Sequence, residues 1–176
     1  MHLKLLNIYE ATDKQAEAQE LLKSMCKKFR ESCKVHHRRQ LFFLKHGNPE
    51  KAKEALEKAL QALPPRKHLK ASLKFAISEY KEGSFERGRT LFEGLVSAFP
   101  KRADLWSVYL DQEQRLADNE LHIRRLLDRI TSLSLSTKKM KYFFKRFLDF
   151  EAKFGSAATI EHVKQKARSY VESRIA

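Results

Sequence analysis

The sequence predicts an all-α protein, a right-handed α-α superhelix (a solenoid) of about five helix pairs. The first observation is a pattern of a cation, then a large apolar residue, then an acidic residue, which begins at Lys53, Arg89 and Arg124, about 35 residues apart. Helix-turn-helix arrays recur every ~34 residues. The second observation is composition: 42% hydrophobic and 33% charged residues with only 5 Gly and 4 Pro favour amphipathic helices over sheets.

The helix pairs follow from the breaks between them. We expect helices at 3–10 and 13–29, 34–46 and 49–62, 67–82 and 85–98, 103–117 and 119–132, and 137–154 and 157–174. Asp13 is a predicted N-cap, because its carboxylate can accept hydrogen bonds from free amides. Gly47 and Pro49 end one helix and begin the next. Together these pairs predict a single repeat domain over 1–176.

The later breaks use similar residues. Ser84 is a predicted N-cap, Gly155 and Ser156 separate the last two helices, and Ser136 or Thr137 begins the fifth pair. Proline cannot continue a helix, so Pro64, Pro65 and Pro100 close the second and third pairs. The chain also begins inside an apparent helix, which predicts that it is the C-terminal piece of a longer protein.

Apolar spacing indicates which side chains form the core. Phe143, Phe147, Phe150 and Phe154 recur at helical spacing and predict one buried stripe. Trp106 heads the clearest aromatic pattern, and we expect it to be buried between helix pairs. Small residues at equivalent places, Ala52 and Gly88, predict close helix contacts.

The A helices carry a more specific pattern. Trp106-x-x-Tyr109-x-x-Gln112-Glu113 has a counterpart in Phe144-x-x-Phe147-x-x-Phe150-Glu151, and a weaker copy ends at Glu79. This pattern resembles the half-a-TPR (HAT) repeat, which occurs mainly in RNA-processing proteins. Segments 104–113, 141–151 and 159–171 further resemble the carboxy-terminal HAT/TPR domain of the large S1-repeat ribosomal RNA biogenesis factors, the programmed cell death protein 11 family.

The resemblance implies a noncatalytic scaffold in pre-ribosomal RNA processing and small-subunit ribosome biogenesis, located in the nucleus and nucleolus. The implied partners are ribosome-assembly proteins, with pre-rRNA as a second candidate. Two alternatives stay open: a HAT scaffold of a splicing or mRNA 3′-end-processing complex, and a generic peptide-binding TPR adaptor.

The net charge is the main functional signal. The chain has 36 Lys and Arg against 22 Asp and Glu, a formal charge of +14, which is typical of proteins that bind nucleic acid or acidic proteins. The simpler interpretation is a solvated face. The candidate binding surface consists of Arg38, Arg39, Arg66, Lys67, Lys70, Arg124, Arg125, Lys138, Lys139, Lys141, Lys145 and Arg146. We expect Lys138, Lys141 and Lys145 to point to solvent, opposite the phenylalanine stripe.

Other chemistry is not expected. Cys26 and Cys33, followed by His36 and His37, lack the usual spacing of a zinc site. The five glycines are isolated, so no phosphate loop is predicted, and no nucleophile-base pairing is visible. The sequence therefore predicts no enzyme, metal, cofactor or small-molecule substrate, and no membrane segment.

Overall fold

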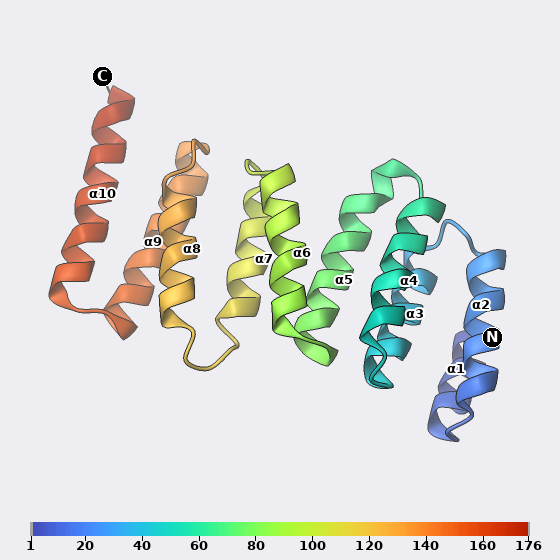
Figure 1. Cartoon of the computed structure of the whole chain (residues 1–176). Helices are drawn as coiled ribbons and strands as arrows, with labels where there is room; N and C mark the ends of the chain where they lie inside the picture. The colour runs from blue at the N-terminus through green and yellow to red at the C-terminus, as the bar shows by residue number, and fades with distance from the viewer. Residues whose placement is uncertain (1, 176) are drawn as a thin grey trace. The chain divides into compact units, whose positions relative to one another are not determined.

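The computed structural model describes residues 2–175 and is built from helices within that range (Figure 1). The helices are α1 His2–Ala11, α2 Gln15–Lys28, α3 Cys33–Lys45, α4 Pro49–Ala62, the 3-10 helix η1 Pro65–Lys67, α5 His68–Glu82, α6 Phe85–Ala98, α7 Ala103–Glu113, α8 Glu120–Thr131, α9 Thr137–Phe154 and α10 Ala157–Ile175. The expected all-α class and the pairing of consecutive helices are confirmed.

The chain forms two compact units, residues Met1–Leu95 and Val96–Ala176. In the first unit α1 packs on α2, and α3 packs on α2, α4 and α5. In the second unit α7 packs on α8, and α9 packs on both α8 and α10. Each unit is thus a series of helices joined by short turns, in which helices that follow one another along the chain pack together, as α3 and α4 or α8 and α9 do.

Each unit has its own apolar core. In the first unit Phe42 and Phe75 are almost fully buried together with Ala52, Ala55 and Ala59 of α4. In the second unit the largest buried side chains include Trp106, Tyr109 and Phe143. Trp106 is 1% exposed, and its Nε1 donates to the carbonyl oxygen of Pro100 over 2.8 Å, so the expected burial of this residue is confirmed.

The turns confirm some predicted caps and correct others. Gly47 adopts φ +66° and Pro49 opens α4, as expected. The Ser84 hydroxyl accepts the Arg87 amide over 3.4 Å, which is an N-cap bond for α6. Asp13 is not an N-cap: it has φ +52°, and Lys14 precedes α2 without a side-chain cap bond.

Two other boundaries differ from expectation. The helix expected over 103–117 ends at Glu113, because the chain turns there and Asp118 adopts φ +51°. The buried Asn119 side chain stabilises this turn by donating to the Glu113 carbonyl oxygen over 3.1 Å. Ser136 stands at the N-cap position of α9 but makes no side-chain cap bond.

The glutamates of the repeat pattern are buried at the ends of the A helices. Glu79 in α5, Glu113 in α7 and Glu151 in α9 are 4%, 0% and 1% exposed. Glu79 accepts a hydrogen bond from Arg87 Nε of the next helix over 3.0 Å. A buried carboxylate needs such partners to offset lost hydration. The repeated glutamate therefore joins helices rather than facing solvent.

Gly88 permits close packing within the third pair. A Cβ atom at this position would lie 2.6 Å from Cε2 of Tyr80 and closer still to the neighbouring ring carbon. The Tyr80 ring therefore lies directly against the α6 backbone. The expectation of a close contact at Gly88 is confirmed.

Candidate macromolecular interface

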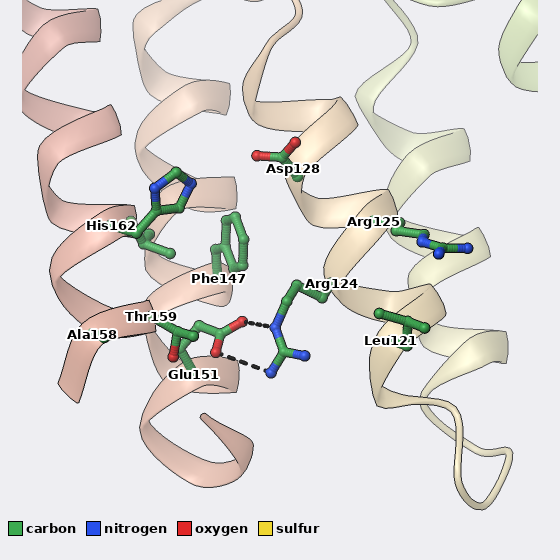
Figure 2. A pocket seen from close by; sticks show the side chains of 10 residues that line it. Leu121, Arg124, Arg125, Asp128, Phe147, Glu151, Ala158, Thr159 and His162 are labelled. Carbon is green, nitrogen blue, oxygen red and sulfur yellow. Dashed lines mark hydrogen bonds and ion pairs between the residues drawn. The ribbon is translucent and has the colours of Figure 1, made fainter. Parts of the chain in front are cut away.

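A groove of about 400 Å³ lies between α8 and α10 over α9. Its floor contains the buried side chains of Phe147 and Val163, and Leu121 stands at its edge with 60% of its surface exposed. Figure 2 shows Leu121 on α8 and the side chains of Thr159 and His162 on α10. An exposed leucine beside an apolar floor makes this groove suited to an apolar side chain of a partner.

Arg124 crosses this groove and is neutralised within it. Its Nε lies 2.7 Å from Glu151 Oε1 and its Nη2 lies 3.1 Å from Oε2 (Figure 2). Burial by itself raises the pKa of Glu151, but hydrogen bonds from Arg124 and Thr159 outweigh it, so this pKa lies below its usual value. The same hydrogen bond raises the pKa of Arg124. The charge of Arg124 is therefore used to pair with Glu151 and hold α8 against α9.

The neighbouring Arg125 is placed differently. It is exposed and points away from Arg124 (Figure 2). Another cation of this region, Lys166, donates to the Asp128 carbonyl oxygen over 2.8 Å and ties α10 to α8. Arg125 is therefore the basic side chain of this groove that remains available to an acidic partner.

A second candidate surface lies along the exposed face of α9. Lys138, Lys141 and Lys145 are exposed, as expected, Lys139 is exposed as well, and Tyr142 beside them is 49% exposed. We call these five residues the α9 lysine face. Phe143, Phe144, Phe147 and Phe150 are buried on the other side of the helix. Phe154 is 47% exposed, so its expected place in the buried stripe is wrong, because α9 ends at this residue.

Arg124 does not extend the α9 lysine face. Its partner Glu151 lies in the last turn of α9, whereas Lys138 lies in the first turn. Arg146 is also paired within the second unit. Its Nη2 donates to Asp111 Oδ1 over 2.9 Å and to Gln114 Oε1 over 2.8 Å. These two arginines join helices.

The remaining candidates lie in the first unit. Arg38 bonds to Asn7 and Glu10 of α1, each over 2.8 Å, and thereby holds α1 against α3. Lys67 donates to the Glu31 carbonyl oxygen over 2.7 Å. Arg66 and Lys70 are exposed at the start of the third pair. Arg39 lies in a separate groove with other cations.

Several groove residues were missing from the expected surface. Leu121 is apolar, and His162 stands apart from the Lys and Arg clusters that mark the expected basic surface. Lys23 and Lys58 lie far apart in the sequence and meet Arg39 only in the folded unit. The spacing of Lys23 and Lys27, four residues apart on one helix face, was the available signal.

Neither cysteine has a metal-like environment. Both thiols are free, and burial raises the pKa of Cys26 although Arg39 opposes the shift. Within residues 2–175, no group of three or more His, Cys, Asp or Glu side chains is placed to hold a metal ion. In the same range, no helix has the length and apolar character needed to cross a membrane.

No protein-family model matches this sequence. It is 46% identical over 176 residues to rRNA biogenesis protein RRP5 of Arabidopsis thaliana, covering 100% of this chain and 9% of that protein. It is 42% identical to rrp5 of Schizosaccharomyces pombe, covering 96% and 10%, and 37% identical to the RRP5 homolog of Mus musculus, covering 98% and 9%.

Among solved structures, a tetratricopeptide repeat protein from Parabacteroides merdae aligns with a TM-score of 0.44 and 16% identity, covering 92% of this chain and 67% of that chain. The paired helices and the grooves between them define the chain as a helical-repeat domain. By sequence the whole chain is similar to one segment of the RRP5 rRNA biogenesis proteins, and this segment spans about a tenth of their length. The resemblance found in the sequence is thereby confirmed.

Proposed function

We propose that this chain is a noncatalytic scaffold domain in pre-ribosomal RNA processing and small-subunit ribosome biogenesis. It binds ribosome-assembly proteins, has auxiliary affinity for pre-rRNA, and works in the nucleus and nucleolus. The observation that carries the proposal is the match of the whole chain to proteins named for rRNA biogenesis. The helical-repeat architecture supports a binding role, because such arrays present extended surfaces to partners.

The groove between α8 and α10 is the proposed protein contact. Its occupant is an amphipathic acidic segment of an assembly protein, with an apolar side chain over Phe147 and carboxylates near Arg125. The apolar floor and exposed Leu121 support the first feature, and the formal charge of +14 supports the second. The α9 lysine face supplies the auxiliary RNA affinity, since exposed lysines bind phosphates without sequence preference.

The test uses the fission yeast relative, in which the matching segment is replaced by this chain. In that hybrid, Leu121→Glu should reduce ribonuclease-resistant capture of ribosome-assembly proteins and cause small-subunit pre-rRNA to accumulate. Ile8→Glu is the matched control, because Ile8 is 56% exposed and lies in the first unit. Normal capture and normal pre-rRNA processing in the Leu121→Glu hybrid would exclude this groove as the protein contact.

A further inference from the structure

A basic groove of about 520 Å³ lies in the first unit between α2, α3 and α4. Its nitrogen-bearing lining comes from three helices and the turn after α2, and it consists of Lys23, Lys27, Arg30, His36, Arg39 and Lys58. The two remaining lining residues are Cys26 and Ala62. Arg39 belongs to the candidate binding surface expected from the sequence.

The lining of this basic groove contains no carboxylate. In contrast, the groove between α8 and α10 includes Asp128 and Glu151. Five side chains with permanent positive charge therefore converge on one concave surface. Their mutual repulsion opposes folding, so an anion bound here would relieve it.

Two of the five cations have carboxylate partners at the rim. Lys23 lies 3.4 Å from Glu20, with side chains 59% and 75% exposed, and Lys58 pairs with Glu54. Exposed pairs of this kind contribute little and are easily exchanged. Lys27 and Arg30 are exposed and form no ion pair with any residue in the described range. They remain available to a ligand.

The basic groove is also held in shape. His36, which is 4% exposed, donates from Nε2 to the Arg30 carbonyl oxygen over 2.7 Å and fixes the turn that carries Arg30. The Arg39 guanidinium lies near the Cys26 thiol, where it lowers the pKa of that thiol against the effect of burial, and it lies 5.7 Å from the centre of the Phe43 ring. A guanidinium that is already positioned loses less entropy when it binds an anion.

We propose that this basic groove binds successive phosphates of an RNA backbone. The inference rests on the proposed function, which gives the chain its RNA affinity, and it adds a second RNA site to the α9 lysine face. A phosphate backbone requires only positive charge and donors, both of which the lining supplies. An acidic protein segment would also need a pocket for an apolar or aromatic anchor, and Cys26 and Ala62 are too small to form one.

The first experiment measures binding of a fluorescent single-stranded oligouridine to the full 176-residue chain at several salt concentrations. Lys27→Gln combined with Arg30→Gln should weaken binding about tenfold at low salt and flatten the salt slope by about 1.4, or 0.7 per lost contact. Lys4→Gln combined with Lys14→Gln is the matched control. It removes the same charge from exposed lysines outside the basic groove and should leave affinity nearly unchanged.

Cys26 provides a second, independent measurement. It lines the basic groove, whereas Cys33 does not, and both thiols are partly exposed. Oligouridine should slow alkylation of Cys26 by N-ethylmaleimide several-fold and leave the rate at Cys33 unchanged, as followed by peptide mass spectrometry. Equal rates with and without RNA would overturn the proposal, and so would an equal loss of affinity in the control variant.

Two further comparisons distinguish RNA from an acidic protein as the ligand of the basic groove, and distinguish RNA binding by this groove from capture of assembly proteins. Tighter binding of an oligoglutamate of equal charge, with protection of Cys26, would assign the basic groove to an acidic protein and overturn the RNA site. In the fission yeast hybrid, Lys27→Gln combined with Arg30→Gln should retain ribonuclease-resistant capture of assembly proteins. Loss of RNA binding with intact capture supports the basic groove independently of the protein contact.

Discussion

Arg124 on α8 and Glu151 on α9 form a two-bond ion pair, with 2.7 Å between Nε and Oε1 and 3.1 Å between Nη2 and Oε2. Glu151 is 1% exposed, whereas the Arg124 side chain is 32% exposed. This geometry places both guanidinium donors on one carboxylate, which is the strong form of the interaction. The pair joins two adjacent helix pairs at the end of α9.

Arg124→Ala should therefore destabilise the second unit. We expect a loss of about 2–3 kcal/mol in the free energy of unfolding, below the ~3–5 kcal/mol typical of a fully buried pair because Arg124 is partly solvated. Arg125→Ala is the control at the adjacent position and should change stability by less than about 0.5 kcal/mol. Urea denaturation followed by circular dichroism compares the two. Equal effects would show that the ion pair contributes nothing specific.

The ion pair also predicts a dependence of stability on pH. The folded pKa of Glu151 is depressed, so its contribution is fully present above the unfolded pKa of about 4.3 and is lost as pH falls through the lower folded value. Glu151→Gln should be less stable than the wild type at neutral pH. The difference should shrink as the pH is lowered below about 4.3. Thermal midpoints measured from neutral to acid pH test this, and a constant difference would contradict it.

Substitution of Gly88 and of Gly94, both in α6, should change the stability in opposite directions. Gly88→Ala should destabilise by about 1–3 kcal/mol, because the new methyl group would overlap the Tyr80 ring. Gly94→Ala should instead stabilise by about 0.5–1 kcal/mol, because no atom lies within 4 Å of its added Cβ and alanine favours a helix. Thermal denaturation of the two variants shows whether each midpoint falls or rises. The packing assigned to α6 is wrong if both variants shift in the same direction.

Trp106 should be among the residues most important for stability in the second unit. Trp106→Ala should cost about 3–5 kcal/mol because it leaves a cavity at a site that is 1% exposed. It also removes the donor to the Pro100 carbonyl oxygen. Trp106→Phe keeps much of the volume and should cost less. An unchanged thermal midpoint for Trp106→Ala would contradict the packing.

The α9 lysine face can be tested apart from the basic groove. Changing Lys138, Lys141 and Lys145 together to Glu should weaken RNA binding without unfolding the chain, because all three are exposed. Each lost phosphate contact should flatten the salt slope by about 0.7–0.9. Fluorescence anisotropy with a structured pre-rRNA piece measures this, and circular dichroism checks the fold. Unchanged affinity and slope in the folded variant would exclude RNA binding by this face.

The sequence determined the helices of this protein and most of the breaks between them. Helix formation depends on local spacing, so Gly47, Pro49 and Ser84 could be assigned to their turns without knowledge of the fold. The burial of Trp106 followed in the same way from the aromatic spacing of its helix. Asp13 was assigned wrongly as an N-cap. An N-cap residue has an extended backbone with negative φ, whereas Asp13 has φ +52°.

Only the tertiary structure decided which charged side chains are available to partners. Arg124 and Arg125 are adjacent in the sequence, yet one is paired with Glu151 and the other is exposed. Lys23 and Lys58 join one basic groove although 34 positions separate them. A charge is neutralised or left available according to which residues packing brings within a few ångströms. Such neighbours come from other helices, so helical periodicity, which describes one helix at a time, cannot specify them.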